Sequence, residues 1–163
     1  APLDPDGSRD DIGALPYDAA YAHGPAVYCD AKPASGGCLP SISASGVSSA
    51  TAAAPFLVEA TGIVENRLGI LIHGGAPAAL PFQGGVLCIG GSIQRTTAQL
   101  SGSAGAACTG SFSFDFNAYA QASGDLALAP GELVFAQYWF RDPQDPAGFG
   151  SGLTDAVRFG IGL

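Results

Sequence analysis

Residues 132–142 read ELVFAQYWFRD, the longest aromatic-rich stretch of the chain and the one that holds its only tryptophan. Because a β-strand sends alternate side chains to opposite faces, the even positions form one unbroken apolar face of Val134, Ala136, Tyr138 and Phe140. This pattern predicts a central strand whose even face lies in the core. The odd face changes from Leu133 and Phe135 to Gln137, Trp139 and Arg141. We therefore expect its far end to contact a ligand, a partner or an overlying loop.

Shorter alternating stretches surround this strand at the spacing that is typical of an all-β sandwich. The expected strands span residues 41–47, 56–64, 67–73, 86–89, 93–100, 111–121 and 155–161. Residues 74–85 and 142–154 are expected to be loops, and one helical turn is expected at 125–128. The phenylalanines of 111–121 (Phe112, Phe114 and Phe116) point into the core in this interpretation, whereas His73 shares an outward face as a hydrogen-bonded structural imidazole.

The predicted fold class is therefore all-β, an antiparallel β-sandwich of the jelly-roll or immunoglobulin-like type with an irregular N-terminal arm. Residues 1–27 form the arm or linker, and residues 28–163 form the sandwich domain. A chain of 163 residues fits one such domain.

Charge and hydropathy limit the possible partners. Charged residues make up 12% of the chain, about half the usual share, and mean hydropathy is +0.27. These values favour a neutral surface of small residues, as in an extracellular protein or one that neighbours cover. The chain has a net charge of −8, whereas nucleic-acid binders are basic, so no nucleic-acid partner is expected. The apolar runs are far shorter than the roughly 18 residues that span a bilayer, so no membrane span is expected.

The four cysteines, Cys29, Cys38, Cys88 and Cys108, contain no C-x-x-C pair, and the chain has only two histidines. This composition favours disulfides over a zinc site and predicts an oxidising compartment. Three connectivities are possible. We expect the local one, Cys29–Cys38 with Cys88–Cys108, in which each short loop contributes about 3 kcal/mol in the chain-entropy model.

Four carboxylates, Asp4, Asp6, Asp10 and Asp11, surround Gly7 near the start of the chain. Such a spacing can bind calcium, although alignment on Gly7 places Pro2 and Gly13 where an EF-hand loop needs its first and twelfth ligands. The alternative is a solvated turn that side chain to backbone hydrogen bonds stabilise. Calcium is the one cofactor that the sequence suggests.

The same segment, residues 4–14 (DPDGSRDDIGA), resembles the D-P-D-G-[ST]-R-x-D-I-G-A motif that closes the last coil of right-handed parallel β-helices in large bacterial extracellular proteins. Later segments resemble the C-terminal β-sandwich module of those proteins: Tyr28-Cys29, Gly37-Cys38, 81–85 (PFQGG), 113–117 (SFDFN), 137–139 (QYW), Arg141-Asp142 and 154–156 (TDA). The resemblance implies a secreted sandwich domain after a β-helix and a longer precursor. It implies no particular activity.

Catalysis is poorly supported by the motifs. A nucleophilic triad would need His23 or His73, and the chain has no G-x-S-x-G elbow. The glycine pairs form no phosphate-binding loop. We therefore expect no catalytic residues and no enzyme activity.

Binding is better supported, because Gln137, Trp139, Arg141 and Asp142 combine an aromatic ring with hydroxyl-binding groups, as carbohydrate sites do. The alternative is structural: Trp139 packs under the 142–154 loop, and Arg141 pairs with Asp142 or Asp145.

Two functional classes follow from these observations. The first is a non-catalytic structural or adhesive module, a subunit or terminal domain of a secreted or cell-surface assembly. Its partners would be neighbouring subunits, further copies of the chain or an upstream β-helix domain. The second is a carbohydrate-binding module appended to a β-helix enzyme that acts on polysaccharide.

Overall fold

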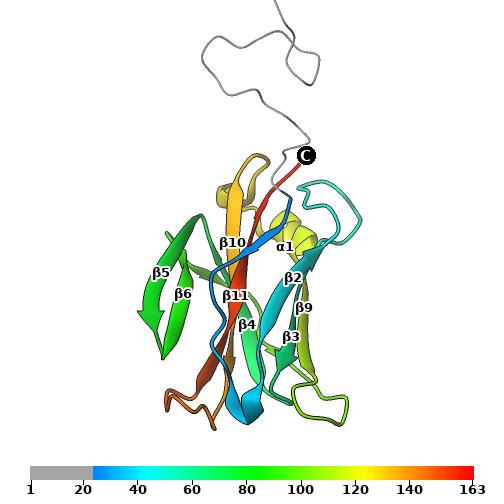
Figure 1. Cartoon of the computed structure of the whole chain (residues 1–163). Helices are drawn as coiled ribbons and strands as arrows, with labels where there is room; N and C mark the ends of the chain where they lie inside the picture. Colours follow the sequence, from blue (N-terminus) through cyan, green and yellow to red (C-terminus); the bar gives the residue numbers. More distant parts are fainter. Residues whose placement is uncertain (1–23) are drawn as a thin grey trace, which may run out of the picture.

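The computed structural model describes residues 24–163 and arranges them in three layers of antiparallel strands (Figure 1). The large sheet has the order β1 (Ala26–Tyr28), β11 (Ser151–Gly160), β10 (Leu133–Arg141) and β4 (Leu68–Gly74), and β4 also pairs with β7 (Gln94–Arg95) and β8 (Gln99–Leu100). The small sheet contains β2 (Ser41–Ser45), β3 (Leu57–Ile63) and β9 (Gly110–Asp115). The third layer is the hairpin of β5 (Ala76–Phe82) and β6 (Gly85–Gly90). The predicted all-β sandwich is confirmed.

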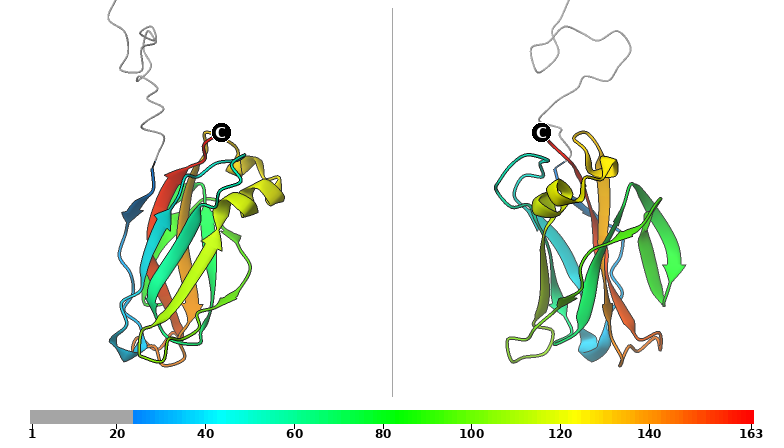
Figure 2. Two further views of the ribbon diagram at one scale, coloured as in Figure 1. Left: turned by 90° about the vertical axis from the view of Figure 1, so that its right-hand side faces the viewer. Right: turned by 180° about the vertical axis from the view of Figure 1, so that it is seen from behind.

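The main core lies between the two larger sheets. The rear view of Figure 2 shows these sheets facing each other. As predicted, β10 is central, between β11 and β4, and its even side chains are at most 1% exposed. Tyr138 stacks on Phe112 of the small sheet with ring centroids 5.2 Å apart. Its hydroxyl donates to the carbonyl of Val58 at 2.8 Å, so this buried polar group is satisfied.

Two glycines make room for Phe140 in the core. Gly69 and Gly152 lie directly opposite it on the neighbouring strands, and a methyl group at either position would collide with the Phe140 side chain. The Phe140 ring fills the space beside Gly152, and the Phe112 ring with the Phe140 Cβ fills the space beside Gly69, so larger residues at these two positions would force the core apart.

A second apolar cluster lies between the large sheet and the hairpin. Its buried members are Ile72, Cys88, Ile89, Phe135 and Ala156. Both faces of the large sheet are thus buried where the hairpin covers it, which explains why the odd positions of β10 begin with apolar residues. We call the hairpin side of the large sheet its outer face.

The disulfide prediction is wrong in its pairing. Cys29 bonds to Cys88 and Cys38 to Cys108, with sequence separations of 59 and 70 residues. Each bond joins segments that are distant in sequence because the strands fold back on one another between them. In the chain-entropy model each contributes about 4 kcal/mol, more than the local pairs would.

The expected strand at 111–121 ends after five residues. β9 stops at Asp115, and α1 (Phe116–Ser123) follows. The Asp115 carboxylate accepts a hydrogen bond from the Ala118 amide at 3.2 Å, which is the N-cap geometry that starts a helix. Phe112 and Phe116 are buried as predicted, whereas Phe114 is half-buried.

Other expected boundaries also change. Residues 74–85, predicted as a loop, contain β5, whose prolines are tolerated because the strand lies at a sheet edge. In place of the expected strand 93–100 the structure has two short strands, β7 and β8. The loop expected at 142–154 is shorter than predicted, since β11 begins at Ser151. The helical turn is confirmed at Leu126–Leu128, where Asp125 caps it.

His73 does not face outward. It is 3% exposed and lies against Phe116 and Tyr119, whose side chains pack with the main core. Its expected role as a hydrogen-bonded structural imidazole is confirmed by the Tyr119 hydroxyl, 3.1 Å from Nε2.

Candidate functional site

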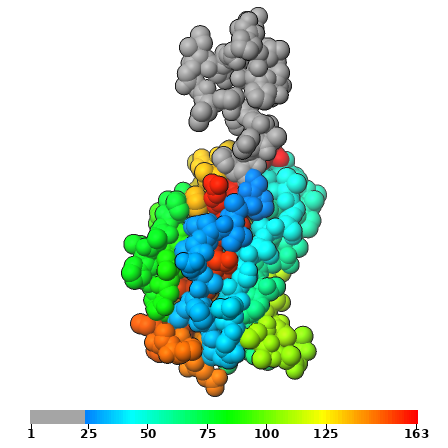
Figure 3. All heavy atoms as spheres, viewed as in Figure 1, coloured from blue at the N-terminus to red at the C-terminus, as the bar shows by residue number. Residues whose placement is uncertain are grey.

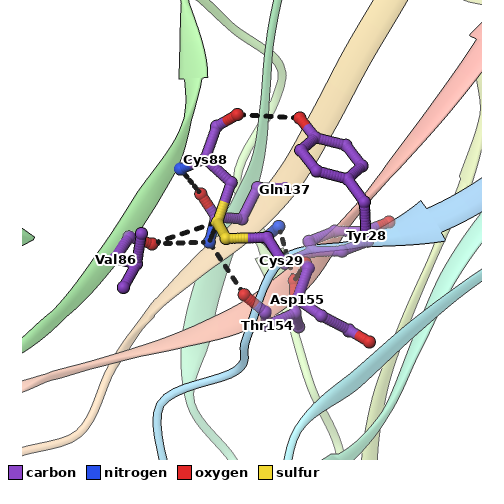
Figure 4. Close-up of a disulfide and its surroundings, with 8 residues drawn as sticks. Tyr28, Cys29, Val86, Cys88, Gln137, Thr154 and Asp155 are labelled. Carbon is purple, nitrogen blue, oxygen red and sulfur yellow. Dashed lines mark hydrogen bonds between the residues drawn. A yellow bond between two sulfur atoms is a disulfide. The ribbon is translucent and has the colours of Figure 1, made fainter. Parts of the chain in front are cut away.

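Gln137, one of the four predicted ligand residues, is fully buried and holds the hairpin to the large sheet (Figure 4). Its Oε1 accepts from the Cys88 amide at 3.0 Å, and its Nε2 donates to the carbonyls of Val86 at 3.0 Å and Thr154 at 2.8 Å. The side-chain amide thus binds β6 as a neighbouring strand would. The amide oxygen and the amide nitrogen of Gln137 thus have their partners inside the fold.

The disulfide Cys29–Cys88 joins the end of β1 to the same strand of the hairpin (Figure 4). Beside it, the Tyr28 hydroxyl donates to the Cys88 carbonyl at 2.7 Å. Burial raises the pKa of Tyr28 to about 12, so the hydroxyl keeps its proton and remains a donor at neutral pH. We call Gln137, Tyr28 and this disulfide the hairpin clasp.

Asp142, the second predicted ligand residue, is also buried. Its carboxylate accepts from the amide and the hydroxyl of Ser35 at 2.7 and 2.5 Å. It therefore ties the loop after β10 to the segment between β1 and β2, and it forms no pair with Arg141.

The buried ion pair of the described residues joins Lys32 to Asp145 at 2.6 Å. Lys32 also donates to the carbonyls of Gln83 and Ser151, each at 2.7 Å, so each of its three protons has an acceptor. Burial acts to raise the pKa of Asp145, but hydrogen bonds from Lys32 and from the amides of Ala147 and Phe149 hold it below its usual value. Figure 3 shows the segment after β1, in blue, near the 142–150 loop, in orange, toward the lower end of the molecule.

Trp139 and Arg141, the other two predicted ligand residues, lie together on the outer face. The guanidinium carbon of Arg141 is 5.4 Å from the centre of the Trp139 ring, a cation–π contact. The indole N–H donates to Gln83 Oε1 at 3.0 Å, and the Phe82 ring meets the indole edge-on at 6.4 Å. The hairpin turn, and not the 142–154 loop, therefore fixes the tryptophan.

A groove of about 210 Å³ opens beside this pair. Its lining residues come from β4, β10 and the segment between β7 and β8: Leu68, Gly69, Ile70, Ala98, Trp139, Phe140 and Arg141. Leu68 and its cross-strand partner Leu100 are 55% and 61% exposed. The apolar face of β4 thus continues past the hairpin into solvent. Leu68, Ile70 and Ile72 alternate along the sequence of β4, so the apolar face could be found from the sequence, but only the reach of the hairpin shows which part of it is uncovered.

A second cavity, of about 150 Å³, lies at the other end of β4 beside His73, Ser92, Gln94 and Asp125. Burial lowers the pKa of His73, against a smaller raising effect of the Asp125 charge. The neutral imidazole that results is consistent with its structural hydrogen bond to Tyr119.

The predicted metal ligands Asp4, Asp6, Asp10 and Asp11 lie outside the described residues, as does His23. Among residues 24–163, no three histidine, cysteine, aspartate or glutamate side chains lie close enough to hold a metal ion. In the same part of the chain, no helix has the length and hydrophobicity needed to cross a lipid bilayer.

Comparison with protein-family models finds no match, and searches of curated proteins and of solved structures also find no similar protein. The class that the described residues define is therefore a disulfide-bonded all-β sandwich with a third, hairpin layer.

Proposed function

We propose that the chain is a non-catalytic structural or adhesive module of a secreted or cell-surface assembly. The observation that carries this proposal is the use of its buried polar side chains: Gln137, Asp142, Lys32 and Asp145 all bind other parts of the fold. Together with two disulfides between distant segments, they stabilise a domain against conditions outside the cell.

Neighbouring subunits, further copies of the chain or an upstream β-helix domain are the partners that suit this role. The low share of charged residues, 12%, supports it, since small neutral surfaces lose little solvation when they pack against a neighbour.

Three measurements test this proposal. Fractionation of cells that make the protein is expected to place it outside the cell or at the surface, and alkylation before reduction is expected to label no cysteine. Sizing of the oxidised chain over a range of concentrations then shows whether copies associate. A cytosolic protein with four reactive thiols would refute the proposal.

The groove beside Trp139 favours a second candidate function, carbohydrate binding. A half-buried indole next to exposed leucines and an arginine offers both an apolar surface and hydrogen-bond donors, which is the combination that sugar sites use. In this function the module would hold a polysaccharide for an enzyme domain or anchor the assembly to one.

A further inference from the structure

The outer face of the large sheet has an unusual charge. Arg95 lies opposite Ile72, and Arg158 opposite Phe135, and both of these partners belong to the cluster under the hairpin. Because directly opposite residues share a face of a sheet, both arginines project from the outer face, as does Arg141 two residues beyond Trp139. All three are exposed.

No carboxylate of these strands balances them. The six strands of the large sheet contain one acidic residue, Asp155, and its carboxylate accepts from the Ile42 amide of the small sheet at 2.7 Å. Among residues 24–163, none of the three arginines forms a salt bridge. A chain with a net charge of −8 thus presents a cationic sheet face.

One of these arginines lines the groove, and a second lies on the same face beyond its lining residues. Arg141 lines one end of it, and Arg95 lies two strands away and about four residues along, which places their backbones roughly 16 Å apart from the strand rise and spacing. A small anion cannot reach both guanidiniums, but a polymer with repeated charges can. Between them the floor is apolar, with Ile70 and Leu68 on β4.

The Arg141 guanidinium is oriented before any ligand arrives. Its cation–π contact with Trp139 holds the guanidinium beside the groove, and a guanidinium can donate two parallel hydrogen bonds to a carboxylate. Trp139 is itself held by Gln83 and Phe82, so little conformational entropy is lost on binding.

We propose that this groove binds a uronate-containing polysaccharide. Carboxylates of the sugar chain bind Arg141 and Arg95, and the C–H faces of the rings between them pack on Leu68, Ile70 and Trp139. A peptide suits the groove less well, since its amides would lose water over a floor that offers almost no polar partner. The inference rests on the carbohydrate-binding candidate function and specifies its ligand.

The test uses Trp139, the only tryptophan of the chain, as a fluorescent reporter in the full oxidised protein. The probes are hexamers of galacturonate, glucuronate and mannuronate, with the methyl ester of the hexamer that binds best and cellohexaose as neutral references. We expect at least one uronate hexamer to change the emission and to bind at least tenfold more tightly than both neutral sugars. Added salt should weaken this binding.

Two variants with the same loss of charge locate the site by calorimetry. Arg141→Gln removes charge-assisted hydrogen bonds and should weaken binding by about 10- to 100-fold. Arg158→Gln lies on the same face but outside the groove, and its affinity should stay within about twofold of the original. Circular dichroism and melting curves confirm that both variants fold.

The outcomes separate the inference from the function on which it rests. Equal binding of the methyl ester or of cellohexaose would leave carbohydrate binding standing and refute the uronate inference. Failure of all the sugars to bind the folded protein would refute both. An equal loss in Arg141→Gln and Arg158→Gln would mean a diffuse charge effect and would overturn the site.

Discussion

Substitution of Lys32 by methionine should destabilise the domain, because it removes one partner of a buried ion pair. Methionine keeps an apolar stem of similar length but leaves the Asp145 carboxylate and the carbonyls of Gln83 and Ser151 without their shared donor. Removal of one partner from a buried ion pair costs about 3–5 kcal/mol. We expect about 3 kcal/mol, the lower end, because Phe149, which lies over the ammonium, is itself 58% exposed.

Urea unfolding of the oxidised chain measures this loss. With a slope of about 2 kcal/mol per molar urea, the midpoint should fall by about 1.5 M with the slope unchanged. Arg158→Met is the matched control, because it removes an exposed cation and should change stability by less than about 0.5 kcal/mol. If Lys32→Met were as mild as this control, the ion pair would contribute no more than a surface salt bridge, and the reasoning would be refuted.

The pH dependence gives an independent check. The pKa of Asp145 is held below its ordinary value of 3.8, so the ionised carboxylate stabilises the fold at pH values above about 3.8. This contribution is lost as the pH falls through the lower, folded pKa. The difference in stability between the original chain and Lys32→Met should therefore be full at pH 7 and shrink below pH 4. A difference that did not change with pH would exclude the ion pair as its cause.

Three further predictions concern the cross-links, the core and the buried histidine. Mass spectrometry of an unreduced digest should show Cys29 linked to Cys88 and Cys38 linked to Cys108; a peptide that joins Cys29 to Cys38 would contradict the fold. Phe112→Ala should cost about 3–5 kcal/mol in denaturant and Phe114→Ala clearly less, because Phe112 is 2% exposed and Phe114 half-buried; equal losses would mean that the core side is misassigned. His73 has a lowered pKa, so the unfolded chain binds its proton more readily and stability should fall as the pH drops through about 6.5; His73→Gln should flatten this slope in melts from pH 5 to 8.

Patterns that depend on one strand alone could be predicted from the sequence. The even positions of β10 followed from strict alternation, and Val134, Ala136, Tyr138 and Phe140 are buried as expected. The helical turn expected at 125–128 is present at Leu126–Leu128, where the structure shows Asp125 as its cap.

Features that depend on how distant segments contact one another could not be predicted from the sequence. Local spacing favoured the wrong disulfides. Cys29 meets Cys88 only because the hairpin folds over β10, and the spacing of the cysteines does not reveal that contact. His73 was assigned to the solvent side because its strand is covered on both faces, and alternation cannot distinguish two buried faces from one. The strand expected at 111–121 was too long because the alternation of Phe112, Phe114 and Phe116 continues past Asp115, where the chain turns into a helix.

The hairpin connects the fold to the proposed ligand groove. It covers the outer face of the large sheet over Phe135 and Gln137, and its turn ends beside Trp139, where Gln83 holds the indole. The hairpin clasp holds β6 in place over β10. Trp139 and Arg141 therefore lie at the border between the covered and the open half of the sheet. The hairpin that occupies the Gln137 side chain, and so keeps it from a ligand, is thus the element that holds Trp139 at the edge of the groove.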